Sequence, residues 1–374
     1  MDQIIHLLAN GEEVIDVDEE SFLLFAQDIP SNNLGMLNPR APSVEISING
    51  NEYTIHQSPS LLSSHRAGGT TGAGARMICT SSFMICPRNP QRPQTQARTS
   101  PQVFTRVRSA QTRPEGQGVE FSSRPIRFLW KITPLFAEWI TNPSNPLWTT
   151  SLLSQSSTVA ELGTGISALV SLVLAPSVRH YIATDQEYVR KLFRTNLDAN
   201  ASVGASSSNS KAKGKSKGSK SSKSKSQSTV KPVDNISFTT LDWETDQAAS
   251  LKECMESDDA QAQDEEEGED KGFDLLLSCD CIYNEALVAP FVRTCAEICR
   301  LRPAYVAGSE EPRPRRKPTV CIIAQQQRSP DVFETWLRET MREFRVWRLS
   351  DDVLGKGLKN GSGYLVHLLL AKDK

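Results

Sequence analysis

A short glycine-rich segment is the first part of this chain whose residue types suggest ligand chemistry. Residues 161–165 (ELGTG) follow an apolar run and precede a second apolar run with helical spacing. Glycines let the backbone turn tightly and approach a ligand, and a following helix N-terminus favours bound polar or anionic groups. Twenty residues after Gly165 comes Asp185, whose carboxylate can accept hydrogen bonds from both hydroxyls of a ribose. This pattern is shared by proteins that bind nicotinamide, flavin and S-adenosylmethionine (SAM).

Two further polar clusters come at the ends of apolar segments. Residues 240–244 (TLDWE) place Trp243 where its ring can stack on an adenine while the neighbouring acid meets the exocyclic amine. Residues 278–285 (SCDCIYNE) contain Asp280 and Tyr283. Taken singly, such residues are often helix caps or core side chains. Open α/β sheets bind ligands at the carboxyl ends of their strands, so four successive strand ends of this kind predict one ligand pocket.

Alternating strands and helices are expected to position these residues. The pattern predicts strands at 159–162, 180–184, 236–241, 273–279, 319–324, 345–349 and 364–370, and helices at 166–174, 187–200, 286–299 and 332–344. The alternation indicates a mainly parallel sheet covered on both faces. The last two strands leave no room for a helix between them, so we expect them to pair antiparallel. Residues 43–57 alternate apolar and polar around an Asn-Gly turn and predict a β-hairpin.

Three tracts of biased composition divide the chain. Residues 74–126 are rich in Arg, Pro, Gln, Ser and Thr without periodicity, which predicts a disordered low-complexity insertion. Residues 201–231 are nearly all Ser, Lys and Gly, residues 253–271 are acidic, and both are expected to be disordered, solvated insertions. The predicted organisation is an N-terminal extension with the hairpin at 1–73, the first insertion, and one α/β domain at 127–374.

Composition excludes several classes of protein. The 374 residues carry 42 Lys+Arg against 44 Asp+Glu, so the positive excess of a protein that coats nucleic acid is missing. A hydrophobic content of 38% is below the roughly 45–50% typical of globular proteins, which fits a core diluted by polar insertions. The eight cysteines form no Cys-x-x-Cys pair and the five histidines lie far apart, so we expect no metal. We expect no disulfide framework, secretory signal or membrane span.

The motifs together resemble those of the seven-strand protein-lysine methyltransferases of family 16. The segments that carry the resemblance are LWKITP (129–134), ELGTG (161–165), TDQ (184–186), LDWE (241–244) and DCIY (280–283), the last matching the family's Asp-x-x-Tyr signature. More narrowly, these segments and QQQR (325–328) resemble the fungal members of the family that methylate ribosomal proteins. The resemblance covers residues 43–73 and 127–374.

The resemblance implies a class I, Rossmann-like SAM-dependent methyltransferase fold with an antiparallel last strand. It further implies SAM as the cofactor and transfer of a methyl group to a lysine of a ribosomal protein of the large subunit. Asp280 and Tyr283 match the catalytic signature, Asp280 orienting the incoming ammonium or the cofactor and Tyr283 walling the lysine channel. The positions that match cofactor contacts are Trp130, Gly163, Thr164, Gly165, Asp185, Trp243 and Cys279. We expect a monomer in the cytoplasm or also in the nucleus, with no membrane association and no direct nucleic-acid specificity.

The chain departs from the family pattern between residues 73 and 128. In relatives, a segment like Gly69–Gly72 leads almost directly into the Leu-Trp pair, whereas here the inserted tract intervenes. Both flanks match and the insert does not, so our hypothesis is a retained intron or a gene-model error. Transcript sequencing that shows continuous coding across codons 73–127 would contradict this hypothesis.

Two other functions stay open from the sequence. An NAD-dependent oxidoreductase suits the glycine turn and Asp185 equally well, although Trp243 and the absence of a Tyr-x-x-x-Lys pair count against it. A non-catalytic adaptor with a methyltransferase fold is the other alternative. The intact Asp280 and Tyr283 argue against such a loss of activity.

Overall fold

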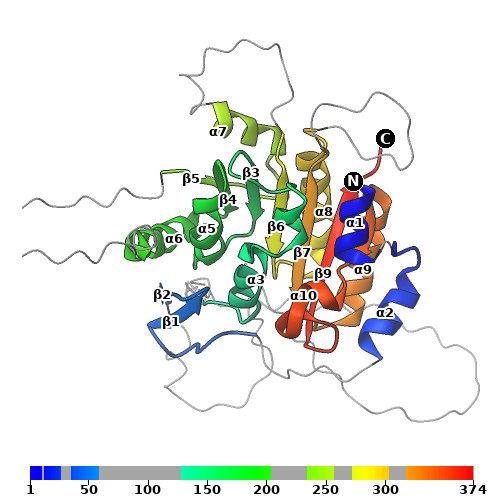
Figure 1. Cartoon of the computed structure of the whole chain (residues 1–374), viewed down its shortest axis with the longest axis horizontal. Helices are drawn as coiled ribbons and strands as arrows, with labels where there is room; N and C mark the ends of the chain where they lie inside the picture. The colour runs from blue at the N-terminus through cyan, green and yellow to red at the C-terminus, as the bar shows by residue number, and fades with distance from the viewer. Residues whose placement is uncertain are drawn as a thin grey trace, which may run out of the picture.

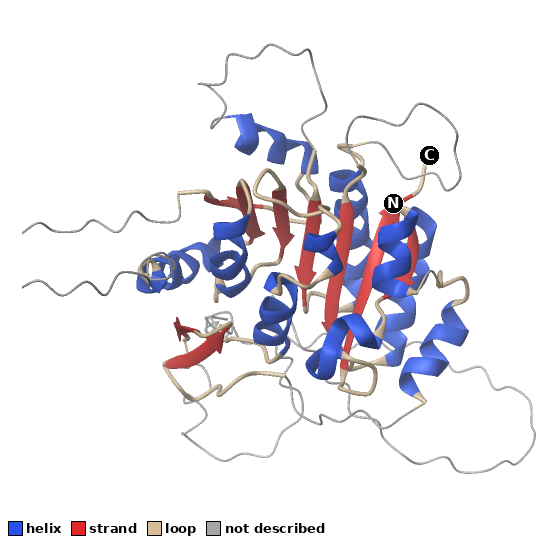
Figure 2. Ribbon diagram, in the orientation of Figure 1, coloured by secondary structure: helices blue, strands red, loops and turns tan. Residues whose placement is uncertain are grey.

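A computed structural model of the chain describes residues 1–10, 12–26, 35–58, 128–203, 234–256, 272–302 and 317–373. Within these ranges, one large sheet lies between two layers of helices (Figures 1 and 2). The predicted insertion 74–126 lies wholly outside the described residues, as do most of 201–231 and 253–271. At the start of the last tract, residues Glu253–Glu256 form a short helix, α7. None of the described helices combines the length and apolar character that crossing a bilayer requires.

The large sheet contains seven strands in the order β5-β4-β3-β6-β7-β9-β8. The strands are β3 (Thr158–Leu162), β4 (His180–Asp185), β5 (Ile236–Thr240), β6 (Leu275–Cys279), β7 (Val320–Gln326), β8 (Phe344–Arg348) and β9 (Tyr364–Ala371). The first five in this order pair parallel, and β9 pairs antiparallel with both β7 and β8. The predicted strands are confirmed, and so is the expected class I methyltransferase fold, because its characteristic feature is a parallel sheet with one reversed strand near the edge.

Helices cover both faces of this sheet. One apolar core lies against α1 (Asp2–Ala9), α3 (Ile132–Thr141), α4 (Pro146–Thr149), α5 (Leu169–Leu174), α6 (Glu187–Asn200) and α10 (Asp351–Leu358). The other core lies against α2 (Val17–Phe25), α8 (Glu285–Cys299) and α9 (Pro330–Glu343). On β6, Leu275 and Leu277 belong to the first core and Leu276 to the second. Successive strand residues point to opposite faces, so an almost wholly apolar strand such as β6 is what a sheet covered on both sides requires.

The prediction that no helix fits between the last two strands is wrong. Helix α10 lies there, with Leu354 and Leu358 buried and Asp351 in its first turn. Gly355 has φ 67° and interrupts the helical conformation, which glycine tolerates because it has no Cβ. The connection from residue 349 to residue 363 is long enough for this eight-residue element. The antiparallel pairing of β8 and β9 is nevertheless confirmed.

The predicted hairpin is confirmed as β1 (Ser43–Ile48) and β2 (Asn51–His56). The two turn residues, Asn49 and Gly50, have φ values of 51° and 79°, the positive values that a tight two-residue hairpin turn needs. The side-chain amide of Asn196 on α6 bonds the backbone N–H and C=O of the last residue of β2, at 2.7 and 3.1 Å. The hairpin is therefore fixed to the helix that follows β4.

Candidate functional site

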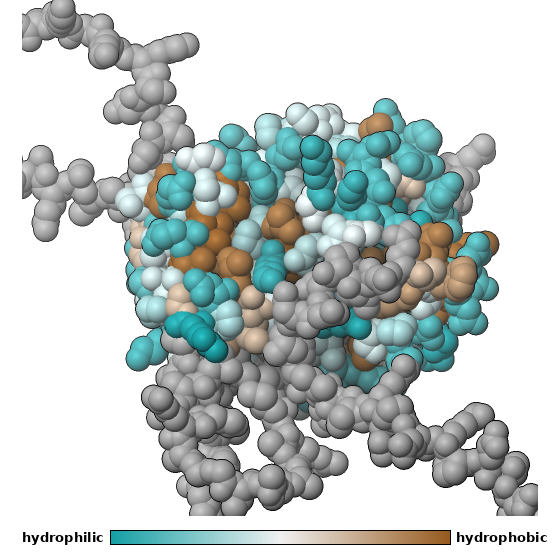
Figure 3. Space-filling model, turned by 90° about the horizontal axis from the view of Figure 1, so that it is seen from below, coloured by the Kyte–Doolittle hydropathy of each residue, from teal (hydrophilic) through white to brown (hydrophobic). Residues whose placement is uncertain are grey.

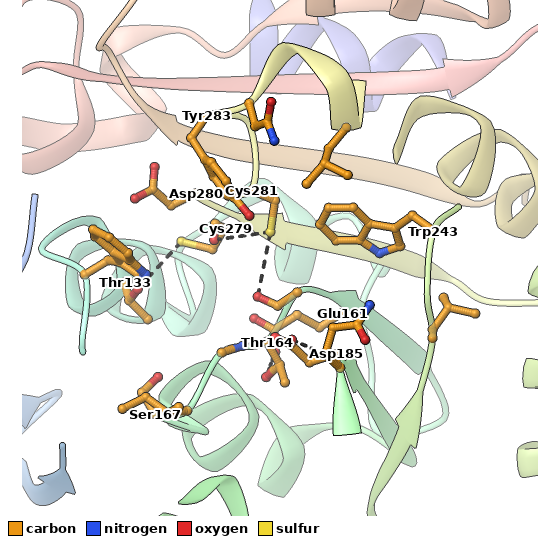
Figure 4. Close-up of a pocket in the computed structure, with 18 of the residues that line it drawn as sticks. Thr133, Glu161, Thr164, Ser167, Asp185, Trp243, Cys279, Asp280, Cys281 and Tyr283 are labelled. Carbon is orange, nitrogen blue, oxygen red and sulfur yellow. Dashed lines mark hydrogen bonds between the residues drawn. The ribbon is translucent and has the colours of Figure 1, made fainter. Parts of the chain in front are cut away.

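A cavity of about 600 Å³ lies at the carboxyl ends of β3, β4, β5 and β6. All nine residues predicted to bind cofactor or substrate line it: Trp130, Gly163, Thr164, Gly165, Asp185, Trp243, Cys279, Asp280 and Tyr283. Figure 4 shows the side chains that converge on the cavity, with the ring of Tyr283 extending into it. A view from below shows apolar side chains gathered in separate patches, left of centre and at the right edge, on a face that also carries many hydrophilic residues (Figure 3). The four strand ends meet at one cavity, as expected. The role of each residue in it stays a prediction.

The glycine loop turns sharply after β3. Gly163 and Gly165 have φ values of 68° and 64°, a region that side chains with a Cβ rarely adopt. A Cβ on Gly163 would come within 2.3 Å of the Cys281 Sγ and 3.4 Å of the Trp243 ring. The backbone N–H groups of residues 163 and 164 donate to the Thr184 carbonyl at 2.9 and 3.0 Å. Glycine is therefore required at position 163, where the loop passes between two other strand ends.

Asp185 ends β4 and supports the glycine loop. Its Oδ2 accepts the Gly165 N–H at 2.8 Å and its Oδ1 accepts the Gln186 N–H at 2.7 Å. A carboxylate oxygen has two lone pairs, so each oxygen keeps an acceptor site for a ligand hydroxyl. Burial raises the pKa of Asp185 to about 6, while the two backbone hydrogen bonds act in the opposite direction. The group is therefore ionised at neutral pH and fits a vicinal diol.

Glu161 is a pocket residue that we did not predict to be functional. Its Oε2 accepts hydrogen bonds from the hydroxyls of Thr164 and Tyr181, both at 2.7 Å. Burial, with a smaller contribution from the charge of Asp185, raises the pKa of Glu161 to about 7, against the effect of the two hydroxyls. The sequence signal was available, because Glu161 opens the ELGTG motif. A buried carboxylate held only by neutral donors can take a cationic ligand group.

Trp243 follows β5, and its ring lies beside the glycine loop at Gly163. Its ring packs edge-on against Phe291 with centroids 5.0 Å apart, and its backbone carbonyl accepts a hydrogen bond from Arg293. Its indole N–H is buried and has no hydrogen-bond partner among the described residues. Buried polar groups are normally satisfied, so a ligand acceptor in this position would complete the site.

Two buried thiols form the floor of the pocket. The Cys281 Sγ lies 3.4 Å from the Leu162 carbonyl oxygen, and the Cys279 Sγ lies 4.0 Å from the Thr133 hydroxyl. Burial raises the pKa of both thiols well above the ordinary value, and the nearby carboxylates act in the same direction. Because the thiolate is the nucleophilic form, these cysteines shape the pocket and do not act as nucleophiles.

Asp280 follows β6 with φ 66°, a conformation that Asp tolerates better than most residues. Its Oδ1 and Oδ2 accept hydrogen bonds from the two terminal nitrogens of Arg328 at 2.5 and 2.6 Å. Its Oδ1 also accepts the Gln326 N–H at 3.0 Å. Arg328 was quoted in the QQQR motif but not predicted as a pocket residue. Its guanidinium lies 5.6 Å from the centre of the Trp130 ring.

Trp130 is placed by backbone pairing with a segment near the N-terminus. The Leu37 N–H donates to the Leu129 carbonyl at 2.7 Å. The Lys131 N–H donates to the Gly35 carbonyl, also at 2.7 Å. These bonds flank Trp130 on both sides and hold it at the pocket, although the long inserted tract precedes it in the sequence. Trp130 therefore lines the pocket, and its contact with a cofactor stays a prediction.

The chain is similar to known proteins over part of its length. No family model matches it. A protein of Zygosaccharomyces rouxii is 25% identical over 229 residues, which cover 58% of this chain and 64% of that protein. A protein of Candida glabrata is 26% identical over 240 residues, which cover 58% and 63%. Both are named ribosomal lysine N-methyltransferase 5. This chain resembles fungal ribosomal lysine N-methyltransferase 5. The resemblance is distant but consistent, and it spans less than two thirds of the length of these two relatives.

Other matches are shorter or weaker than those to ribosomal lysine N-methyltransferase 5. A diaminohydroxyphosphoribosylamino-pyrimidine deaminase of Schizosaccharomyces pombe is 36% identical over 72 residues, 19% of this chain and 17% of that protein. Among solved structures, a putative SAM-dependent methyltransferase from Streptococcus mutans has a TM-score of 0.39 at 9% identity and covers 89% of this chain and 56% of that one. The N-methyltransferase NodS from Bradyrhizobium japonicum has a TM-score of 0.30 at 12% identity and covers 62% and 90%. These scores are low, and the fold assignment rests on the strand order of the chain itself.

Proposed function

We propose that this chain is a SAM-dependent protein-lysine N-methyltransferase that acts on a ribosomal protein of the large subunit. The observation that carries the proposal is the single pocket in which Asp185 and the signature residues Asp280 and Tyr283 lie together. The names of the sequence relatives support the lysine and ribosomal parts of the proposal. A ribosomal target also implies that the protein acts in the cytoplasm or nucleus, where ribosomal proteins are made and assembled.

The residues of the pocket fit an adenosyl cofactor. Asp185 would accept the two ribose hydroxyls with the lone pairs that its backbone hydrogen bonds leave open. The Trp243 ring and the backbone of Cys279 would contact the adenine. The glycine loop and the carboxylate of Glu161, with its pKa of about 7, would hold the charged amino-acid end. When bound, SAM supplies a methyl group on a positively charged sulfur, already activated for transfer.

In this reaction, the role of the protein would be to position a neutral amine and to exclude water. The lone pair of the lysine nitrogen forms the new N–CH3 bond, and the electrons of the broken S–CH3 bond stay on sulfur. Lysine is mostly protonated at neutral pH, with a reference pKa near 10.4, so its proton must leave to water before attack. Tyr283 would line the channel through which the amine enters. The buried thiols of the pocket are protonated, and no strong general base is needed.

Methylation of purified ribosomal proteins tests the proposal. The full chain is incubated with tritiated SAM and large-subunit proteins purified from yeast, and labelled peptides are sequenced by mass spectrometry. We expect label on a lysine of one large-subunit protein. Asp280→Ala should remove most turnover while calorimetric binding of S-adenosylhomocysteine (SAH) survives, with the exposed Asp198→Ala as a control. Binding of SAH without any transfer would favour the adaptor alternative, and no binding of SAH would overturn the proposal.

A further inference from the structure

The Asp280–Arg328 pair occupies the end of the pocket that carries the signature residues. The Asp280 side chain is 1% exposed and that of Arg328 is 17% exposed. The two hydrogen bonds between them, at 2.5 and 2.6 Å, are parallel and bidentate. Such a fork is among the strongest polar contacts in proteins, because both charge and geometry match. The carboxylate that the sequence assigned to the incoming ammonium is therefore already occupied by a cation of the chain itself.

A lysine ammonium is poorly suited to displace this arginine. An ammonium is a compact point charge and cannot reproduce the planar fork of the guanidinium. The Oδ1 of Asp280 is further committed to the Gln326 N–H at 3.0 Å. Expelling Arg328 would leave its own charge in a largely buried place. The pair should consequently persist when a substrate enters.

The aromatic surface next to the pair is also in contact with Arg328. The guanidinium lies 5.6 Å from the centre of the Trp130 ring, within the range of a cation–π contact. A carboxylate and an aromatic face are the two features that usually bind an ammonium. At this end of the pocket, the same arginine engages both of them.

We propose that Arg328 is a positioning residue that keeps the protonated amine away from Asp280, so that the pocket accommodates the neutral amine. This inference rests on the proposed function, since it specifies how the same site selects the reactive form of its substrate. The guanidinium of Arg328 is a cation. Its positive charge disfavours a second cation beside it and lowers the pKa of an adjacent amine.

The other titratable groups of this region do not replace the charge of Arg328. They are Glu161 on β3, Asp185 on β4, Tyr188 on α6, Asp242 and Glu244 after β5, Cys279, Cys281 and Tyr283 at the end of β6, and Tyr364 on β9. Burial and the charge of Asp280 raise the pKa of Tyr364, and Arg328 acts in the opposite direction. These side chains are carboxyl groups, phenols and thiols, and none of them can carry a positive charge. Among the pocket residues that the structure describes, Arg328 is therefore the side chain that supplies a positive charge.

An equilibrium titration tests the inference without requiring turnover. The full chain, with and without SAH, is titrated with n-butylammonium chloride at pH 7, and tryptophan fluorescence reports binding. We expect Arg328→Met to bind the amine about tenfold more tightly than wild type, the effect of one pKa unit of charge interaction. The double variant Asp280→Asn/Arg328→Met should return to the wild-type value. Equal affinity of wild type and Arg328→Met would overturn the inference.

A matched control and a conservative variant complete this titration. Arg300→Met removes a comparable pair, Arg300–Glu343 at 2.6 Å, and should behave as wild type. Arg300 follows the 15-residue helix α8, which begins beside the pocket and is about 22 Å long at 1.5 Å per residue. Arg328→Lys keeps the positive charge and should still exclude the amine, which covers the case in which Arg328→Met does not fold. Tight amine binding by Arg328→Lys would contradict the role of charge.

The pH profile of single-turnover methyl transfer separates this role from a purely structural one. Loss of Arg328 leaves the Asp280 carboxylate free to stabilise the substrate ammonium, so the apparent pKa of the rate should rise in Arg328→Met. Its rate should then fall below wild type at pH 7 and recover toward it at higher pH. A uniform loss at every pH would indicate a structural role and overturn the inference. Failure of wild type to bind SAH or transfer a methyl group would instead refute the proposed function.

Discussion

Glu161 and Glu20 are both buried carboxylates that accept hydrogen bonds, yet their pKa values are shifted in opposite directions. Glu161 accepts only from two neutral hydroxyls, and burial raises its pKa to about 7. Burial also raises the pKa of Glu20, but His367 and Arg348 together outweigh it and hold the pKa below its usual value. Hydrogen bonds join Glu20 to Arg348 at 3.0 Å and to His367 at 3.3 Å.

The difference separates carboxylates that stabilise the fold from those that are available to a ligand. Glu20 lies on α2 and its partners lie at β8 and on β9, so its charge is neutralised by the contacts that attach the helix. Glu161 and Asp185 are held by neutral donors only, and their remaining capacity faces the cavity. Asp280 lines the same cavity but is paired like Glu20, which is why we assign it a different role from Asp185.

Glu20→Ala should give the largest change in stability. It leaves the half-buried Arg348 and the buried His367 without their carboxylate, and we expect the free energy of unfolding to fall by about 3 kcal/mol. Because the folded pKa of Glu20 is lowered, its contribution is present above the unfolded pKa and is lost as pH falls through the folded value. Urea unfolding at pH 7 measures the effect, with the exposed Glu19→Ala as control. Equal stability of both variants would mean that the pair does not hold α2 in place.

Asp185→Ala should give the next largest effect, on ligand affinity. Two charge-assisted hydrogen bonds to the ribose would be lost at about 1.5 kcal/mol each or somewhat more, which corresponds to roughly a 100-fold weaker binding of SAH. Asp185→Asn keeps one acceptor and should lose less. Isothermal calorimetry measures the affinities. An unchanged affinity in Asp185→Ala would remove the ribose assignment at the end of β4.

The pH dependence of SAH binding should follow the same carboxylate. The pKa of Asp185 in the free protein is about 6, and its ionised form is the better acceptor for hydroxyl donors. Affinity should therefore rise with pH up to this value, by at most about tenfold per pH unit, and level off above it. Asp185→Asn should remove the part of this dependence that is centred near pH 6. An identical profile in wild type and variant would show that another group controls binding.

Thr164→Val should give the smallest effect. It removes one of the two donors to the Glu161 Oε2, a hydrogen bond worth about 1 kcal/mol. The pKa of Glu161 should rise from about 7 by less than about one unit. Carbon-detected NMR of the labelled carboxyl group measures this shift. A lowered pKa would contradict the view that neutral donors are what stabilise the ionised form of Glu161.

Local sequence patterns predicted the sheet and most of the residues that line the pocket. They did not predict contacts between residues far apart in the sequence. Parallel strands covered on both faces are apolar runs, so β6 was easily recognised, and strand ends such as Asp185 follow from the chain order. The pairing of Asp280 with Arg328 joins residues 48 positions apart and leaves no local signature. Helices α1 and α2 were not predicted, because they are short and depend on contacts that only the folded chain provides: α1 packs on β8, and Glu20 of α2 bonds to residues of β8 and β9.

Calorimetric titration of the full-length chain with SAH at pH 7.5 is the most direct test of the cofactor pocket. We predict saturable binding of one SAH per chain, displaced by SAM, unaffected by NAD and strongly weakened in Asp185→Ala. Absence of saturable binding in wild type, or displacement of SAH by NAD, would contradict the assignment of this pocket.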